Sequence, residues 1–215
     1  MKIHNSGEIL AQHLYPYFEH KKYYQADNEL HFYRNTSFGR SQIIVNALPY
    51  DDEIFVELHL GLRHHIVEKM LSDILGRSDY YSETSLTFIT NALNLSNSER
   101  HQKRVSCKSK DELLKAGDFF IDFMDRRGFD FLDHYKTLKN IDSLMNDKPI
   151  YSARLANHSY HRCFRAMVTA KVLSRNDYDK LYLMHQQYLA QRGFNGEILH
   201  KFNATFARLK EMYLN

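Results

Sequence analysis

One segment of the chain alternates strictly between aliphatic side chains and other types, and it constrains the fold more than any other feature. Aliphatic residues occupy every second position, namely Ile54, Val56, Leu58, Leu60 and Leu62. Successive side chains of a strand point to opposite faces, so this pattern predicts a half-buried strand with its aliphatic face inward. The β-branched segment 40–48 precedes it across the turn-forming residues 49–52. We therefore predict an antiparallel hairpin.

Helical spacing of apolar residues surrounds the predicted strands. We expect a first helix from Ser6 that kinks or ends near Tyr15, because Pro16 cannot donate a backbone hydrogen bond. After residue 108 the pattern is almost wholly helical, beginning with a capping box at Ser109, and Gly128 is expected to end the first of these helices. The predicted fold class is α+β: an N-terminal helix, an antiparallel sheet of about four or five strands, and a helical C-terminal half packed on the sheet.

The length of 215 residues and the scarcity of linker composition favour a single α+β domain over residues 1–215. Within it, residues 1–108 form the predicted helix and sheet region and residues 109–215 the helical region. The hydrophobic content of 43% excludes a disordered chain and a collagen.

Two cysteines, Cys107 and Cys163, stand alone in the sequence. Neither has the spacing of a zinc site or a disulfide framework, and isolated thiols favour a reducing compartment. No apolar stretch approaches the roughly 20 residues of a membrane-spanning helix. We expect a cytoplasmic protein with no membrane association.

The common catalytic and nucleotide-binding motifs are absent from the sequence. There is no phosphate-binding glycine cluster, no H-E-x-x-H and no G-x-S-x-G. This absence favours a binding function over catalysis without deciding between them. We expect no cofactor.

Positive charge is concentrated in one window of the chain. No Asp or Glu lies between Asp147 and Asp177, although the formal net charge of the whole chain is only +3. On a helix, His158 and His161 would each lie one turn before an arginine. Guanidinium groups bind carboxylates and phosphates with two hydrogen bonds. The sequence therefore predicts an anion- or partner-binding surface made of Arg154, His158, His161, Arg162 and Arg165.

Two interpretations of this surface stay open. The first is a non-enzymatic module that binds an acidic protein partner. The second is nucleic-acid-backbone binding through the basic segments 100–110 and 148–175. A structural interpretation competes with both, because the basic helix could pair inside the fold with Asp118, Asp122 and Asp125.

A third function class rests on the end of the alternating strand. Carboxylates and imidazoles within residues 57–68 could serve a metal-dependent enzyme, although spacing alone does not show that ligands converge, and we predict no metal. Phe55 and Tyr33 mark a strand face that could be an interface. The predicted order of elements is similar to that of small bacterial proteins of unknown function, some of them immunity partners of toxins.

Overall fold

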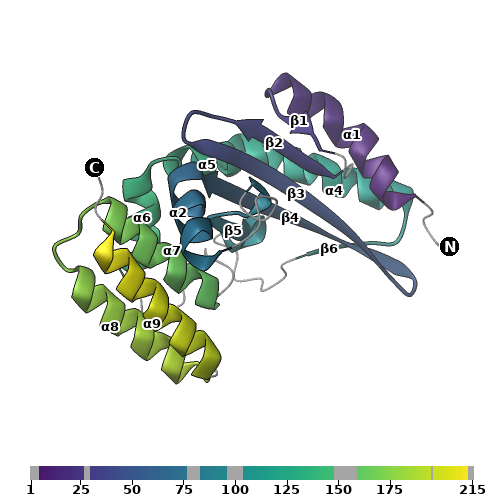
Figure 1. Cartoon of the computed structure of the whole chain (residues 1–215). Helices are drawn as coiled ribbons and strands as arrows, with labels where there is room; N and C mark the ends of the chain where they lie inside the picture. Colours follow the sequence, from purple (N-terminus) through teal and green to yellow (C-terminus); the bar gives the residue numbers. More distant parts are fainter. Residues whose placement is uncertain are drawn as a thin grey trace. The chain divides into compact units, whose positions relative to one another are not determined.

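The computed structural model describes residues 5–26, 30–76, 83–95, 104–147, 159–194 and 196–212 (Figure 1). The fold class is α+β, as predicted: an N-terminal helix, an antiparallel sheet and a helical C-terminal half. Among the described helices, none has both the length and the apolar character that crossing a bilayer requires.

The chain divides into two compact units. Unit 1 comprises Met1–Leu62 and Ile89–His134, and unit 2 comprises Arg63–Phe88 and Tyr135–Asn215. The units do not follow the predicted halves 1–108 and 109–215, because the first helices after residue 108 belong with the sheet. The single-domain interpretation stays a prediction.

The described strands of unit 1 and its borders form one six-stranded sheet. Their order is β1-β2-β3-β4-β5, and β6 also pairs with β4. The predicted hairpin is confirmed as β3 and β4. In the pair of β2 with β3, His31 lies opposite Ile44, and in the pair of β4 with β6, Ile54 lies opposite Cys107. The bounds are Tyr24–Gln25 for β1, His31–Asn35 for β2, Gly39–Tyr50 for β3, Glu53–His64 for β4, Phe88–Asn91 for β5 and Val105–Cys107 for β6.

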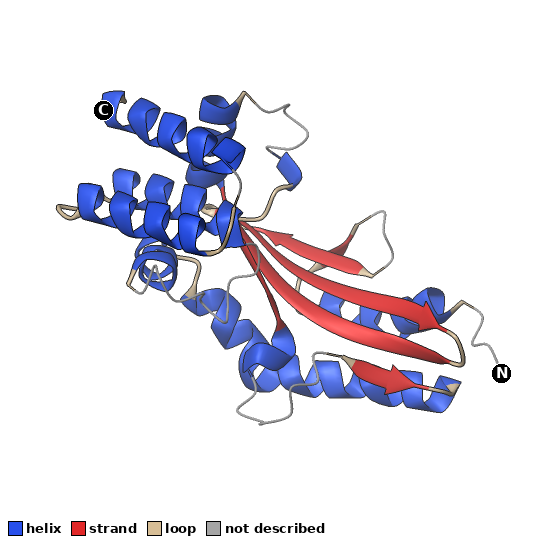
Figure 2. Cartoon of the chain, turned by 90° about the horizontal axis from the view of Figure 1, so that it is seen from below, coloured by secondary structure: helices blue, strands red, loops and turns tan. Residues whose placement is uncertain are grey.

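Two helices of unit 1 cover the same, aliphatic face of the sheet. The ring of Phe18 on α1 (Ser6–His20) lies 4.6 Å from that of Phe32 on β2. Helix α4 (Lys110–Phe123) contacts α1, and Cys107 on the inward side of β6 donates to the carbonyl of Glu112 on α4. Figure 2 shows helices running alongside the strands of the sheet. The alternate residues of β4 are buried beneath these helices, as the sequence pattern predicts.

Helix α1 does not end near Tyr15, so that expectation is wrong. The helix continues through Pro16 to His20. Pro16 is exposed, and so is Gln12, the residue whose carbonyl loses its helical donor to the proline. The buried side chains Leu14 and Phe18 anchor the helix on both sides of the proline.

The predicted cap of α4 is confirmed, but its predicted end at Gly128 is wrong. The Ser109 hydroxyl accepts from the backbone N–H of Glu112 at 3.2 Å. At its other end α4 passes into a π-helical turn, η2 (Met124–Gly128), and then α5 (Phe129–His134). A Cβ on Gly128 would collide with the side chain of Met124, so glycine serves close packing here instead of helix termination.

Unit 2 is a bundle built around one buried helix. Residues 162–170 of α7 (Ser159–Val172) are all buried. Four other helices contact α7, namely α2 (His65–Leu75), α6 (Leu138–Asn146), α8 (Tyr178–Gln191) and α9 (Gly196–Glu211). Polar side chains on α7 must therefore find partners inside the unit, because water does not reach them.

Gly117 sets how closely α4 approaches α1, and this yields a stability prediction. A Cβ at residue 117 would lie 2.5 Å from Cδ2 of His13, whose Nε2 is 2.8 Å from a carboxylate oxygen of Asp118. Gly117→Ala should lower the free energy of unfolding by about 1–2 kcal/mol, since steric displacement outweighs the gain in helix propensity. Urea unfolding measures this. Gly196→Ala is the matched control, because no heavy atom lies within 4 Å of its new Cβ. Equal stabilisation by both substitutions would contradict the role given to Gly117.

Candidate functional site

The structure places the two central residues of the predicted binding surface in the interior. Arg162 is 2% exposed and Arg165 is 6% exposed, so the expectation that they face solvent is wrong. His161 is half-buried, with its ring 3.9 Å from that of Tyr160. Arg154 and His158 lie outside the described residues. The physical reason is that α7 is surrounded by helices, so its polar strip faces other elements instead of water.

Arg165 forms a two-bond ion pair with Glu68 of α2. Its Nε donates to Oε1 at 2.7 Å and its Nη2 donates to Oε2 at 2.9 Å. Burial alone would raise the pKa of Glu68, but the charge and hydrogen bonds of Arg165 outweigh it and lower the pKa. The carboxylate therefore stays ionised and joins α2 to α7.

The same carboxylate organises the segment before β5. The Ser85 hydroxyl donates to Oε2 of Glu68 at 2.7 Å. Buried Arg63 donates to the Ser85 carbonyl at 2.8 Å and to its hydroxyl at 3.0 Å. The backbone N–H of His64 donates to the hydroxyl of Thr87 at 2.8 Å. Because every one of these groups is bonded within unit 2, the cluster is a structural network.

A second buried network joins α6 to α8. Nε2 of His185 donates to Oδ1 of Asn146 at 2.8 Å, and Nδ2 of Asn146 donates to Asp142 at 2.5 Å and to the Ala166 carbonyl at 3.0 Å. Arg175 donates to the other oxygen of Asp142 at 2.6 Å. In the sequence, His185 lies at helical spacing from Leu181, Tyr188 and Leu189, and a polar residue within such an apolar stripe is the signal for an internal hydrogen bond.

Arg162 is held at the edge of this second network. Its Nη1 donates to the carbonyl of Met145 at 3.0 Å, and its guanidinium lies 5.0 Å from the centroid of the Tyr188 ring. Burial lowers the pKa of His185 to about 3, and the Arg162 charge adds to the effect. His185 is therefore neutral near pH 7.

The acidic residues expected to neutralise α7 pair elsewhere. Asp118 bonds to His13, Asp122 lies 2.8 Å from Arg126, and Asp125 lies 2.7 Å from Lys21. All these partners belong to unit 1. Internal neutralisation of Arg165 is thus confirmed, but its partner is Glu68 and not one of the three predicted aspartates.

The two glutamates of the predicted His/Glu site each have a partner within their own unit. Glu57 and His59 are hydrogen-bonded to each other at 3.0 Å on β4, whereas Glu68 is buried in unit 2 against Arg165. Within the part of the chain that the structure describes, no group of three or more His, Cys, Asp or Glu could hold a metal ion. The two cysteines are buried, and burial raises the pKa of Cys107 to about 11 and that of Cys163 to about 12. Neither is an activated nucleophile.

The basic segments of the nucleic-acid interpretation are described only in part. Residues 100–103 and 148–158 lie outside the described ranges. Arg104 is exposed, lies 3.7 Å from Glu57 and places its guanidinium 4.9 Å from the Phe55 ring centroid. A cation already held by a carboxylate and an aromatic ring is a weak phosphate ligand.

The exposed surface of α8 is a further candidate, because Leu183 is the most exposed large hydrophobic side chain among the described residues of unit 2. The helix packs inward through Leu181, His185, Tyr188 and Leu189, which leaves the opposite side toward solvent. On that side Leu183 is 59% exposed, and no charged residue occurs between Leu181 and Gln191.

A positive side chain lies at each end of this uncharged stretch. Lys180 precedes it and forms no salt bridge with any residue in the described ranges, while its neighbour Asp179 is paired with Lys210 at 2.9 Å. Arg192 follows it, with the guanidinium 5.6 Å from the Tyr188 ring centroid. We call Lys180, Leu183, Gln187 and Arg192 the α8 surface.

No protein-family model, curated protein or solved structure matches the chain.

The buried ion pair gives a prediction on stability. Glu68→Gln and Arg165→Met should each lower the free energy of unfolding by about 3–5 kcal/mol, because each leaves a buried charged partner uncompensated. The double variant should lose clearly less than the sum of the two. Arg126→Met, which removes an exposed pair with Asp122, serves as control and should cost less than about 1 kcal/mol. Losses that simply add in a urea double-mutant cycle would contradict the pairing.

His185 gives a prediction on pH. Its folded pKa lies below its unfolded value, so the unfolded chain binds the extra proton between these two values. Stability is therefore full above about pH 6.5 and falls progressively as the pH drops toward about 3. His185→Gln should show a smaller loss of stability between pH 7.5 and pH 5 than the wild type. Burial also lowers the pKa of His64, so some pH dependence should remain. Equal slopes for both proteins would contradict the assignment.

Proposed function

We propose that the protein is a non-enzymatic binding protein that recognises an acidic protein partner through the α8 surface. The observation that carries the proposal is the exposed Leu183 on an uncharged stretch of α8 that Lys180 precedes and Arg192 follows. An apolar centre within a polar rim is the usual composition of a protein interface. The proposed basic helix surface is thus on α8, because the arginines of α7 are buried.

Charge segregation supports an acidic partner. Unit 2 contains 16 Lys and Arg against 10 Asp and Glu, a formal charge of +6, whereas unit 1 contains 13 against 16, a formal charge of −3. A positive unit attracts negative partners and increases their rate of association. The helical unit is therefore the part of the chain that favours acidic ligands.

The dimensions of the surface suggest the form of its ligand. Lys180 and Arg192 are twelve positions apart, which corresponds to about 18 Å along a helix. A partner helix with carboxylates at this separation and an apolar side chain between them would match both cations and cover Leu183. We propose such an amphipathic acidic helix as the bound element.

A second copy of the chain fits this surface poorly. In a two-fold arrangement with antiparallel helices, Lys180 of one copy would face Arg192 of the other. In a parallel arrangement each cation would face its own counterpart. Both arrangements bring like charges together, which opposes association.

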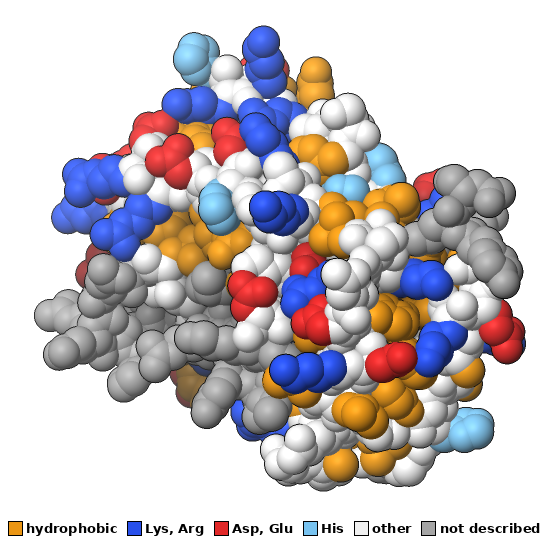
Figure 3. All heavy atoms as spheres, turned by 90° about the vertical axis from the view of Figure 1, so that its left-hand side faces the viewer, with side chains coloured by type: hydrophobic (Ala, Val, Ile, Leu, Met, Phe, Trp, Pro, Cys, Tyr) orange, Lys and Arg blue, Asp and Glu red, His pale blue; other side chains and the backbone are white. Residues whose placement is uncertain are grey.

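Nucleic-acid-backbone binding is the second candidate, favoured by the +6 charge of unit 2. On the face drawn in Figure 3, however, Lys and Arg are interspersed with acidic and hydrophobic side chains. A phosphate backbone is recognised by a continuous positive surface, and an exposed leucine adds nothing to it. This interpretation requires affinity that falls steeply with salt.

The cysteines indicate a cellular location. Both cysteines are free and buried, which supports a reducing compartment, and we place the protein in the cytoplasm.

A pair of designed helical peptides tests the proposal. Both carry the same leucine stripe, one with glutamates and the other with lysines near its two ends about 18 Å apart. Fluorescence anisotropy should show binding of the glutamate peptide only. Leu183→Asp should weaken this binding about tenfold or more, and Lys180→Glu with Arg192→Glu should reverse the preference between the peptides.

The control variant is Lys69→Glu with Lys139→Glu, which makes the same charge change at two exposed lysines of unit 2 on α2 and α6. It should retain the preference for the glutamate peptide. Equal binding of both peptides, or an equal effect of the control, would reject the α8 surface. Tight binding of a duplex oligonucleotide that weakens with salt would support the second candidate instead.

A further inference from the structure

The face of the unit 1 sheet opposite to α1 and α4 carries a distinct set of side chains. Alternate residues of β3 are buried under the helices, so Arg40, Gln42, Ile44 and Leu48 point to the other side. The register adds Tyr33, opposite Gln42, and Tyr24, opposite Tyr33. We call this side the outer face.

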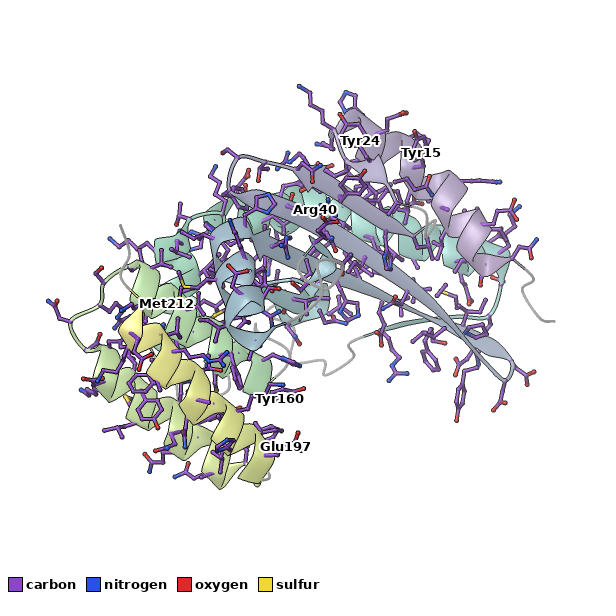
Figure 4. All side chains as sticks on the ribbon, viewed as in Figure 1. Tyr15, Tyr24, Arg40, Tyr160, Glu197 and Met212 are labelled. Atoms are coloured by element: carbon purple, nitrogen blue, oxygen red, sulfur yellow. The ribbon has the colours of Figure 1, made fainter. Side chains whose placement is uncertain are left out.

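Exposed aromatic and aliphatic side chains lie at both ends of the outer face. Tyr24 is 63% exposed at one end, and Leu48 and Tyr50 are 44% and 64% exposed at the other. The Tyr24 ring lies 6.1 Å from that of Tyr33, and Tyr50 lies 6.1 Å from Phe55. Figure 4 labels Tyr24 on β1 and Arg40 on β3. Exposed tyrosine beside arginine is enriched in protein interfaces.

The two ends of the outer face carry opposite charges. At the start of β3, Arg40 stacks 4.8 Å from the Tyr33 ring centroid and donates to Asn35, and it forms no salt bridge within the described ranges. After the end of β3, Asp51 and Asp52 are exposed in the turn and likewise form no described salt bridge. About eleven residues of strand separate the ends, or about 35 Å.

This arrangement is complementary to itself, and we propose that a second copy of the chain binds the outer face as a two-fold dimer. With the two β3 strands antiparallel, Arg40 of each copy meets Asp51 and Asp52 of the other. The same rotation places Tyr24 and Tyr33 over Leu48 and Tyr50 of the second copy. The dimer thereby pairs both charges and covers the exposed rings at both ends.

The middle of the face does not oppose this packing. Glu57 would lie near the two-fold axis, but it is largely buried, hydrogen-bonded to His59 and 3.7 Å from Arg104. Its charge is therefore already balanced within each copy. Half-buried Ile44 supplies an apolar contact close to the axis.

Two other occupants are less compatible with the outer face. A nucleic acid would place phosphates against Asp51, Asp52 and Glu57. A strand added to the part of β3 that extends past β2 would miss one of its donors. Val45 donates toward β2, to the Leu30 carbonyl, and of the next two N–H positions on this edge, residues 47 and 49, the second is proline.

The test is a charge swap measured by sedimentation velocity on the full chain. Wild type should dimerise within the range of about 1–200 µM. Arg40→Glu and Asp52→Arg should each raise the dissociation constant about tenfold or more. The double variant Arg40→Glu/Asp52→Arg should restore the dimer, because only a self-complementary arrangement recovers when both ends change sign.

The control is Lys115→Glu, an exposed charge reversal on α4, which should leave the dimer unchanged. Circular dichroism and urea unfolding verify that each variant folds. The proposal would be overturned if the wild type is monomeric, if the single variants dimerise as the wild type does, or if the double variant does not regain dimerisation. Peptide binding at α8 is a separate readout, so the failure of one surface does not imply the failure of the other.

Discussion

The ion pair between Glu68 and Arg165 is the interaction on which unit 2 depends. It holds the central helix α7 to α2 and, through Ser85 and Arg63, fixes the chain just before it re-enters the sheet. A buried charge is tolerated only when its partner is in place. The pair therefore specifies which face of α7 meets α2, in addition to any contribution it makes to stability.

The same interior arrangement determines which cations are available to a partner. Arg162 and Arg165 are committed to a carbonyl, an aromatic ring and a carboxylate inside the fold. What remains outside is a smaller set that includes Lys180 and Arg192, separated by the uncharged residues 181–191. Recognition by unit 2 then depends on an apolar anchor with charged ends more than on the density of positive charge.

The sequence was sufficient for features that depend on local pattern. The alternation along β4 and the Ser109 cap each follow from one segment alone. The burial of α7 was not predictable in this way. Its histidines and arginines have the spacing of a solvated strip, and only the packing of four other helices around α7 turns that strip inward. Pro16 and Gly128 were misinterpreted for a related reason, since packing on both sides of each carries the helix through it.

A carboxylate that serves two segments of the chain also restricts how the sequence changes over time. Loss of Glu68 leaves both the guanidinium of Arg165 and the hydroxyl of Ser85 without the carboxylate that accepts their hydrogen bonds. A neutral residue at position 68 therefore becomes acceptable only together with a neutral residue at position 165. Among descendants of this chain, the two positions should be inherited as a unit, although they are 97 positions apart along the sequence.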